Sequence, residues 1–311
     1  MKVLSLAAMV AASTLAVELL PTSSLACACG CNVFDVGTAS MLPTDTGVTT
    51  FLEYDFMDQT DNRSGTSSAP AANNADKEIR TNFFTAGVQY QVTRSWGVMA
   101  EVPVWNRTFK TENDAGTGVD TFSHTALGDI RLMGVYTGLS SDLSTGLTLG
   151  VKLPSGDWKY SGFDRDTEIG TGSTDILVGA YHRGSVTNDN RWSYFVQALG
   201  DIPVASQGGY NPGNEVDAAA GVYYDGARLG GGGIKIAPVL QLFASVRGMD
   251  SGPASNPGDT GYERVMISPG IEVSSGKWRL YGDVELPIYS RYNGNQLAAP
   301  VLLKVILSHS F

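Results

Sequence analysis

The stretch VLLKVILSHSF, residues 301–311, decides the fold. Its residues alternate with a period of two, which indicates a β-strand whose two faces meet different surroundings. One side carries Val301, Leu303, Val305, Leu307, His309 and Phe311, and the other carries Leu302, Lys304, Ile306, Ser308 and Ser310. A strand that closes on a bare aromatic residue is unusual for a soluble domain, whose ends are commonly frayed. The rest of the chain repeats this pattern.

Twelve segments of the chain show the same alternation, and helical periodicity is hard to find after residue 30. They span residues 47–57, 79–92, 96–106, 125–137, 145–154, 173–183, 192–203, 215–225, 235–247, 264–274, 278–289 and 300–311. Most suit the roughly 9 to 11 residues of a tilted transmembrane strand, and no run after residue 30 approaches the roughly 20 apolar residues of a membrane helix. The sequence therefore predicts an all-β fold, a transmembrane antiparallel up-and-down β-barrel of about 12 strands.

The connections between these segments alternate in length. The long polar stretch DQTDNRSGTSSAPAANNADKE at 58–78 is followed by the tight turn TRS at 93–95, and long and short connections then take turns along the chain. Outer-membrane barrels have short periplasmic turns and long extracellular loops. We expect the same orientation here, with both ends of the barrel on the periplasmic side, as an even strand number requires.

Six aromatic residues lie at the short-turn ends of the segments: Tyr90, Trp96, Tyr136, Trp192, Tyr224 and Trp278. Each shares the parity of the apolar residues in its own segment, so all six are expected to face lipid at one level, as an aromatic girdle. The alternative is that Trp and Tyr are simply good strand formers. Phe311 lies on the same outer face and resembles the terminal signal that barrel-assembly machinery recognises in outer-membrane proteins.

The N-terminal residues read as a secretory signal, because one lysine precedes an apolar run to about Leu20 and a small-x-small site follows. Cleavage is expected after Ala26 or Ala28. We therefore divide the chain into a cleaved signal peptide (1–26), a periplasmic segment that is a candidate plug (27–46) and a barrel (47–311). The predicted location is the outer membrane of a Gram-negative cell.

The three cysteines, Cys27, Cys29 and Cys31, lie together at the expected mature N-terminus. Thiolates at this spacing suit zinc or copper(I), although the set is incomplete for zinc because no histidine is near. Lipid attachment at Cys27 usually needs an aliphatic residue where Ser24 stands. A metal or redox site, a lipid anchor, and a local disulfide or spare thiol all stay open.

The parity opposite to the apolar face is rich in charge, and such side chains cannot face lipid. It holds Glu53, Asp55, Gln89, Glu101, Asp129, Arg131, Lys152, Asp175, Gln197, Asp201, Asp217, Gln241, Arg247, Arg264, Glu272, Arg279, Asp283, Glu285 and Lys304. Apolar and aromatic residues share this parity, among them Met99, Phe195, Tyr281 and Tyr289. We therefore expect a narrow or partly blocked lumen, since twelve strands lie between side-chain-filled and open barrels.

Four segments place a charged residue two positions before a proline: Glu101 with Pro103, Lys152 with Pro154, Asp201 with Pro203, and Glu285 with Pro287. Proline cannot donate to the strand ladder, so it marks a strand end or a bulge. One interpretation is simple strand termination before a loop. The other is a constriction ring, formed by Glu53, Glu101, Lys152, Asp201, Arg247 and Glu285.

Four short, glycine-rich stretches point to a family. They are ALGDIRL at 126–132, GVKLPSGD at 150–157, GTGSTD at 170–175 and SPGIE at 268–272. In these stretches the sequence resembles the exported barrels of the MetA-pathway-of-phenol-degradation family of outer-membrane proteins. The resemblance implies an outer-membrane barrel that transports hydrophobic or aromatic compounds. The CACGC stretch at 27–31 falls outside the resemblance, so a separate function for the cysteines stays open.

Other functions are disfavoured. The net charge of −10 leaves no basic field for nucleic acid. A barrel-embedded hydrolase needs a nucleophile, base and orienting group together, and His124 is expected in a loop while His182 and His309 face lipid or the periplasmic rim. The FDRDTE stretch at 163–168 lacks the spacing of a known calcium loop, so we expect a solvated acidic loop.

The sequence thus predicts a passive outer-membrane channel or transporter for small solutes, and not an enzyme. The alternative is a structural or ligand-binding barrel without transport. We expect no cofactor. The expected partners are outer-membrane lipid, the barrel-assembly machinery and a small-molecule solute.

Overall fold

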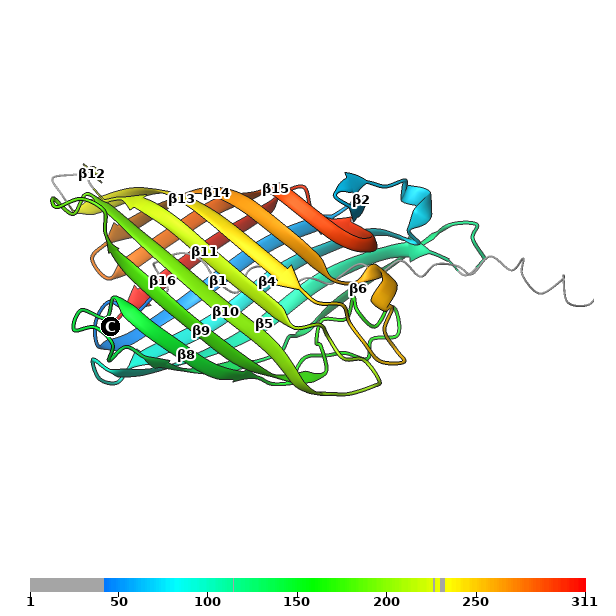
Figure 1. The fold of residues 1–311 in the computed structure, drawn as a ribbon, viewed down its shortest axis with the longest axis horizontal. Coiled ribbons are helices and arrows are strands. Elements are labelled where there is room, and N and C mark those ends of the chain that lie inside the picture. The colour runs from blue at the N-terminus through cyan, green and yellow to red at the C-terminus, as the bar shows by residue number, and fades with distance from the viewer. Residues whose placement is uncertain (1–41, 114, 226, 230–232) are drawn as a thin grey trace, which may run out of the picture.

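A computed structural model describes residues 42–113, 115–225, 227–229 and 233–311. It is a closed antiparallel barrel of twelve strands, as predicted (Figure 1). The barrel strands are β1 (Gly47–Gln59), β4 (Asp76–Gln91), β5 (Trp96–Glu112), β6 (Val119–Leu127) continued by β7 (Arg131–Tyr136), β8 (Thr145–Lys152), β9 (Ser173–Ser185), β10 (Trp192–Ser206), β11 (Glu215–Tyr224), β13 (Ile234–Arg247), β14 (Tyr262–Ser275), β15 (Trp278–Ala298) and β16 (Leu302–Ser310).

Small elements decorate the connections. They are β2 (Asp61–Gly65), β3 (Ser67–Ser68), β12 (Ala227–Leu229) and the one-turn 3-10 helices η2 (Ala71–Asn73) and η4 (Pro257–Asp259). In the part of the chain that the structure describes, no helix has the length and apolar character to cross a membrane. The predicted signal at 1–26, the three cysteines and most of segment 27–46 lie outside the described residues.

The barrel closes between its last and first strands. β16 pairs antiparallel with β1 from Thr49 opposite Ser310 to Met57 opposite Leu302, and β15 pairs with the other edge of β16. Closure leaves neither strand with a free edge, so the backbone groups along both are paired within the sheet. The two-faced strand in residues 301–311 is therefore the strand that completes the ring.

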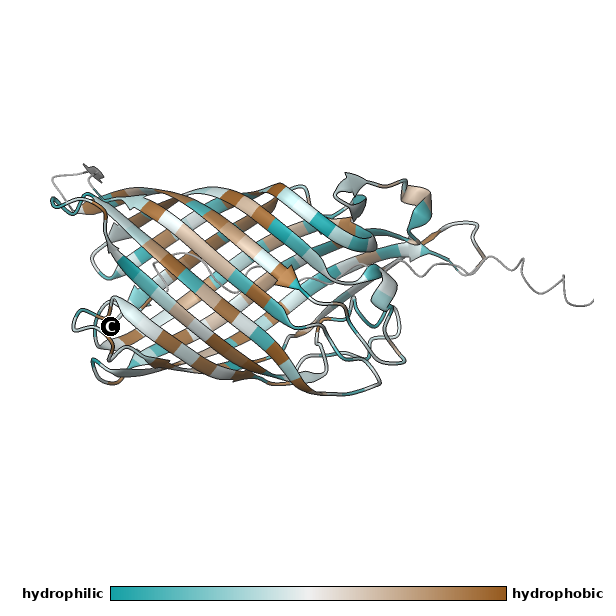
Figure 2. Cartoon of the chain, in the orientation of Figure 1, coloured by the Kyte–Doolittle hydropathy of each residue, from teal (hydrophilic) through white to brown (hydrophobic). Residues whose placement is uncertain are grey.

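The two faces of the barrel differ in chemistry. In β16, Leu303 and Val305 are 38% and 43% exposed, whereas Lys304 between them is 5% exposed. Every barrel strand exposes large apolar side chains in this way, for example Leu52, Phe84, Val98, Leu132, Leu149, Val178, Val196, Val216, Leu240, Ile271, Leu280 and Leu307. Bands of high and low hydropathy accordingly alternate along the strands (Figure 2). The period-two signal thus assigned the faces correctly in these strands.

Several strands are longer than predicted at the end that carries the long loops. β5 and β6 form a hairpin that extends from Val104 opposite Leu127 to Glu112 opposite Val119, and β15 runs to Ala298. His124, expected in a loop, therefore lies in a strand. The extensions are polar, so they lack the apolar period. Their backbone pairing needs no apolar side chains.

Two of the four prolines mark bulges. The β9–β10 register shifts between Pro203 and Ala205, and the β14–β15 register shifts where Pro287 and Tyr289 flank an extra residue. The second shift reverses the parity of the strand, so the prediction that Tyr289 faces inward is wrong. Tyr289 is 44% exposed. A bulge re-aims the side chains that follow it.

One close cross-strand contact inside the barrel yields a stability prediction. Gly87 of β4 is directly opposite Phe51 of β1, and a Cβ added at Gly87 would lie 1.9 Å from the Phe51 ring. We expect Gly87→Ala to destabilise the barrel by about 1–3 kcal/mol through overpacking. The measurement is urea unfolding in lipid vesicles, followed by tryptophan fluorescence. Gly282→Ala is the control, since its added Cβ would lie 3.6 Å from its nearest neighbour, Lys304 O. Equal midpoints for both variants would contradict the expectation.

Candidate functional site

A belt of charged side chains crosses the inner wall near the long-loop end. Glu101 of β5 is opposite Arg131 of β7, Arg131 is opposite Lys152 of β8, and Lys152 is opposite Asp175 of β9. Lys152 Nζ lies 2.5 Å from Asp175 Oδ2 and also pairs with Asp201 Oδ2 of β10. Arg131 Nη1 lies 3.7 Å from Glu101 Oε2. Register alone therefore brings charges of both signs together across these neighbouring strands.

The belt continues from β10 to β13. Asp201 is opposite Glu215 of β11, and Glu215 is opposite Arg247 of β13. The Glu215 carboxylate accepts hydrogen bonds from Tyr262 Oη at 2.6 Å and from Ser245 Oγ at 3.1 Å. We call the set Glu101, Arg131, Lys152, Asp175, Asp201, Glu215 and Arg247 the charged belt.

A second cluster lies where the barrel closes. Lys304 of β16 is directly opposite Asp55 of β1 and Asp283 of β15, and its Nζ lies 3.5 Å from Asp55 Oδ1 and 3.6 Å from Glu53 Oε1. Glu285 follows Asp283 on the same face of β15 and is buried. Four carboxylates thus surround the single ammonium of Lys304.

The predicted constriction ring is therefore divided between two places. Lys152 and Asp201 touch, and Glu101 and Arg247 belong to the same belt through Arg131 and Glu215. Glu53 and Glu285 lie instead in the cluster around Lys304. Alternation placed all six on the inner face, whereas their grouping follows from strand register.

The loop at residues 153–172, between β8 and β9, packs over the belt. The Asp129 carboxylate, between β6 and β7, accepts hydrogen bonds from Gly156 N at 2.9 Å, Thr171 N at 2.8 Å and Thr171 Oγ1 at 2.6 Å. From the inner face of β5, Arg107 Nη1 donates to the backbone oxygens of Thr167 at 2.6 Å and Glu168 at 3.0 Å. The loop is thus held at both ends by side chains of the barrel wall.

Apolar contacts hold the same loop. Phe163 and Ile169 are buried and belong to the core inside the barrel. Phe163 packs edge-on against Phe109 of β5 with ring centroids 5.9 Å apart. Tyr160 stacks on His124 of β6 at 4.1 Å, and His124 Nε2 lies 2.9 Å from Asp157 Oδ2. Residues 153–172 are therefore a packed part of the structure, contrary to the expectation of a solvated acidic loop at 163–168.

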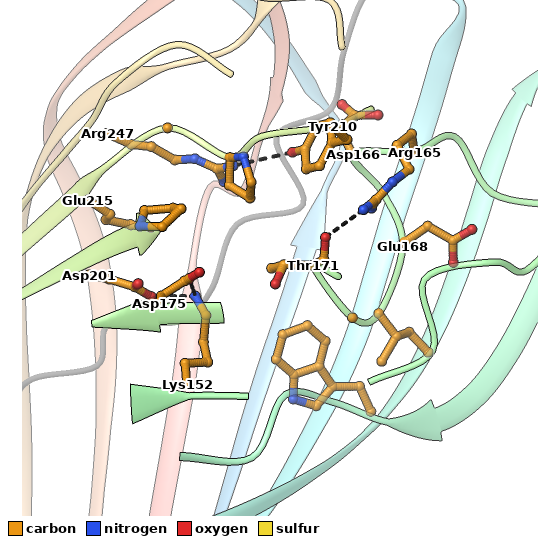
Figure 3. Close-up of a pocket in the computed structure, with 16 residues that line it drawn as sticks. Lys152, Arg165, Asp166, Glu168, Thr171, Asp175, Asp201, Tyr210, Glu215 and Arg247 are labelled. Carbon is orange, nitrogen blue, oxygen red and sulfur yellow. Dashed lines mark hydrogen bonds and ion pairs between the residues drawn. The ribbon is translucent and has the colours of Figure 1, made fainter. Parts of the chain in front are cut away.

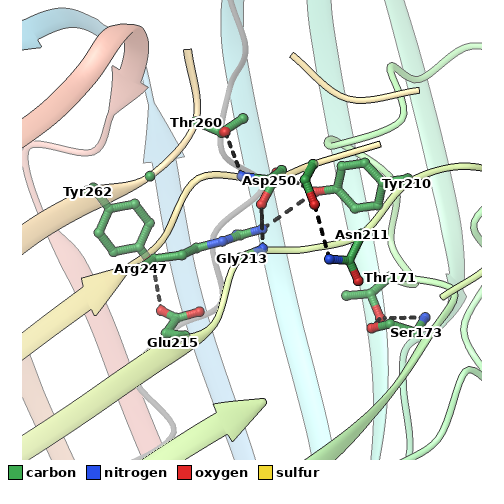
Figure 4. A network of polar contacts seen from close by, with 12 residues as sticks. Thr171, Ser173, Tyr210, Asn211, Gly213, Glu215, Arg247, Asp250, Thr260 and Tyr262 are labelled. Atoms are coloured by element: carbon green, nitrogen blue, oxygen red, sulfur yellow. Dashed lines mark hydrogen bonds and ion pairs between the residues drawn. The ribbon is translucent and has the colours of Figure 1, made fainter. Parts of the chain in front are cut away.

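Two further loops meet this one, as Figure 4 shows. The Arg165 guanidinium of the first loop lies 4.3 Å from the ring centroid of Tyr210. Tyr210 Oη donates to Asp250 Oδ2 at 2.6 Å, and Asp250 Oδ1 accepts from Gly213 N and from Arg247 Nη2, both at 2.8 Å. The loops at 153–172, 207–214 and 248–261 are thereby joined above the belt.

The space enclosed between these loops and the belt is small. Its cavity volume is about 30 Å³, enough for one or two water molecules. Belt residues Lys152, Asp175 and Asp201 line it, together with Arg165 and Glu168 of the loop (Figure 3). No solute larger than water fits there unless the loop moves.

Two carboxyl groups of the loop have unusual pKa values. Burial raises the pKa of Asp166 to about 7, and the nearby Asp250 carboxylate acts in the same direction. Burial also raises the pKa of Glu168 to about 7, against the opposing effects of a hydrogen bond from the Tyr160 backbone and of the Arg165 and Arg107 cations. Glu168 is 8% exposed and its Oε2 has no hydrogen-bond partner. Both groups therefore change charge near neutral pH.

The remaining predicted residues lie as follows. Trp96 packs on Tyr136 with ring centroids 4.7 Å apart, and Trp192 packs on Tyr224 at 5.1 Å. Tyr90 and Trp278 are exposed on the outer face at the same short-turn end. The Phe311 ring contacts His309, which contacts Trp278. These residues form a row of outward rings, whose contact with lipid headgroups stays a prediction.

The histidines and the candidate metal ligands were the other functional residues considered from the sequence. Among those residues, no serine hydroxyl hydrogen bonds to His124, and no group of His, Cys, Asp and Glu side chains could hold a metal ion. His182 is hydrogen-bonded by Thr145 and Tyr194 on the barrel wall. The cysteines, as candidate metal ligands, lie outside the described residues.

Comparison with solved structures bears on the fold. An outer-membrane channel of Pseudomonas putida F1 superposes with a TM-score of 0.67 over 89% of this chain and 100% of that chain, at 13% identity. This chain shares the fold of that channel. The β domain of the Bordetella autotransporter BrkA (TM-score 0.48, 13% identity, 86% and 100% of the two chains) and the CymD monoaromatic hydrocarbon channel (0.44, 10%, 86% and 89%) are more distant.

No protein-family model matches the sequence, and no curated protein matches it either. The resemblance to the MetA-pathway-of-phenol-degradation family is therefore carried by the four short stretches alone. Three of them contribute to the site: ALGDIRL contains Asp129 and Arg131, GVKLPSGD contains Lys152, and GTGSTD contains Thr171 and Asp175.

Proposed function

We propose that the protein is an outer-membrane channel for the passive passage of small solutes, with hydrophobic or aromatic compounds as the favoured class. The observation that carries the proposal is a closed barrel with an apolar outer face and an inner face that mixes charges with aromatic rings. An apolar exterior suits hydrocarbon, and a polar interior suits a path for solutes. Membership of the MetA-pathway-of-phenol-degradation family is part of this proposal.

The inner wall supports the solute class. Phe83, Phe195, Phe243 and Tyr281 are buried on the inner side together with the charged belt and the Lys304 cluster. Aromatic faces offer contact area to apolar rings, and the charges offer partners to a polar group on the same molecule. The interior thus suits an amphipathic or aromatic solute better than a fully hydrophilic one.

The outer face supports the location. The outward rings at the short-turn end suit the headgroup region of a bilayer. In this proposal the short turns face the periplasm, the long loops face the exterior, and Phe311 is the residue that the barrel-assembly machinery recognises. Outer-membrane lipid is then the partner of the exposed apolar band.

The segment at 27–46 is proposed to restrict the short-turn mouth. Its described end supports this, because Leu42 is buried among the core residues inside the barrel. Leu42 also lines a space with Gln89, Arg279 and Ser308, which belong to the inner wall. A channel restricted in this way would pass small solutes slowly.

The channel proposal makes a direct prediction for transport. We expect the purified protein to give single-channel currents in planar bilayers. Liposomes that contain the protein should swell faster in aromatic acids than in sugars or amino acids of similar size. Lys152→Ala and Glu101→Ala should change the conductance, because each removes a belt charge. Lys277→Ala, in an exposed short turn, is the matched control and should leave it unchanged.

A structural or ligand-binding barrel is the second candidate. The small cavity above the belt favours it, since the observed packing leaves room only for water there. Absence of both current and solute uptake, from protein shown to be folded by its heat-modifiable gel mobility, would replace the channel proposal with this one.

A further inference from the structure

We propose that residues 153–172 are a lid over the charged belt, and that ionisation of Asp166 and Glu168 releases the lid. This inference rests on the proposed channel function and extends it. Only the conductance measurement below requires that the protein be a channel, whereas the distance measurement does not. The lid lies where a solute entering from the long-loop end would meet the belt. The contacts of the lid show what keeps it closed and why negative charge on Asp166 and Glu168 would favour opening.

Hydrogen bonds to two side chains of the wall hold the lid, together with the apolar contacts of Phe163 and Ile169 described above. Asp129 accepts three hydrogen bonds from Gly156 and Thr171, and Arg107 donates two to the backbone at Thr167 and Glu168. These bonds attach the loop to the barrel wall near its beginning, at Gly156, and along its last residues, from Thr167 to Thr171. Release of the lid breaks these bonds and exposes Phe163 and Ile169, whereas the strand ladders, which do not include the lid, stay paired.

Negative charge accumulates where the lid meets its neighbours. Asp166 faces Asp250 and Arg247 from the adjoining loop and from β13. Arg247 already pairs with Asp250 at 2.8 Å. If Asp166 ionised, a second carboxylate would lie beside Arg247, which already forms an ion pair with Asp250. Protonated Asp166 avoids this repulsion.

Glu168 is placed still less favourably for a charge. Its side chain is nine-tenths buried and Oε2 has no hydrogen-bond partner, while Arg107 uses two of its hydrogen bonds on lid backbone oxygens. Asp157 adds negative charge from the same lid, and Arg165 adds positive charge. The other charged groups around the shared cavity are Lys152, Asp175, Asp201 and Glu215. The backbone N–H of Tyr160 donates a hydrogen bond to this carboxylate, but burial and the unpartnered Oε2 still oppose closure once Glu168 ionises.

The direction of the pH effect follows from linkage. Both groups have a pKa of about 7 with the lid closed, whereas an exposed carboxyl titrates near 4. The closed lid therefore binds more protons than the open lid between about pH 4 and pH 7. Closure is favoured fully below this window and is lost as the pH rises through about 7. The lid should be closed at pH 5 and open more often at pH 8.

The test uses two readouts, of which one is independent of transport. The three native cysteines are replaced by serine, and spin labels are attached to Ser161→Cys on the lid and Ala254→Cys on the neighbouring loop. Double electron–electron resonance then measures the distance between the two labels. We expect a short, narrow distribution at pH 5 and a longer, broader one at pH 8. In bilayers, the open-channel probability should rise about tenfold over the same range, less than two fully buried carboxyls would give.

Variants distinguish the effect of ionising Asp166 and Glu168 from the effect of removing any carboxylate near the lid. The double variant Asp166→Asn with Glu168→Gln should keep the pH 5 distance distribution and the low open probability at pH 8. Asp120→Asn removes an exposed carboxylate from the β5–β6 hairpin and should behave as the unmodified protein. A distance distribution that is the same at both pH values overturns the lid. A distribution that shifts without any current at either pH supports the lid and contradicts the channel.

Discussion

Lys304→Met is expected to destabilise the barrel by about 3–5 kcal/mol, because it removes the ammonium from a buried group of carboxylates. Lys304 is opposite both Asp55 and Asp283, and lies 3.6 Å from Glu53. Without Lys304 these acids would repel one another where the barrel closes. The measurement is the urea midpoint of the protein refolded in lipid vesicles.

Two further variants show whether charge or packing is responsible. Lys304→Met combined with Asp55→Asn and Asp283→Asn should recover part of the loss, because two of the four carboxylates around Lys304 are then neutral as well. Lys277→Met changes an exposed lysine and should have no effect. A midpoint for Lys304→Met equal to that of the unmodified protein would refute the assigned role.

Arg107→Met is expected to increase the open-channel probability at pH 5 by about tenfold or more. Arg107 is 0% exposed, and it donates to Thr81 Oγ1 at 2.9 Å as well as to the lid at Thr167 and Glu168. Hydrogen bonds to a charged group are each worth about 1.5–3 kcal/mol, and roughly 1.4 kcal/mol corresponds to a factor of ten. Loss of two such bonds should therefore release the lid even when its carboxyls are protonated.

The control for Arg107 lies on the adjacent strand. Arg80→Met removes an exposed arginine of β4 that pairs with Glu78 at 3.6 Å and does not touch the lid in the described contacts. It should leave both the current and the label distance between positions 161 and 254 unchanged. Arg107→Met with an unaltered label distance would show that the lid is held by its remaining contacts. The urea midpoint of each variant distinguishes release of the lid from loss of the barrel.

The regular part of the barrel was predictable because each strand carries its own signal. The position of Lys304 between Leu303 and Val305 is enough to show which side of the strand faces outward, and the alternating lengths of the connections assign the long loops and the short turns to opposite ends of the barrel. The polar extensions of β5, β6 and β15 gave no such signal, since their pairing depends on a partner strand and not on an apolar period. For the same reason Tyr289 was misplaced: a single extra residue beside Pro287 reversed its parity.

The site was predictable only in part. Lys152, Asp175 and Asp201 could be assigned to one face, but their contact could not be predicted, because no tight turn fixes the register of β8 and β9, which the long loop at 153–172 joins. Arg107 lies one residue beyond the segment predicted at 96–106, and no role was predicted for it. Its partners at Thr167 and Glu168 lie some sixty positions further along the chain.

The sequence by itself determined the faces, number and order of the strands. Each strand alternates apolar residues, which face outward, with polar residues, which face inward. The tertiary structure alone decided which charges meet and how the loop at 153–172 is held. Contacts such as Thr171 with Asp129 and Tyr210 with Asp250 join segments about forty residues apart. No local period encodes them, since they form only after the barrel has closed and brought its loops together.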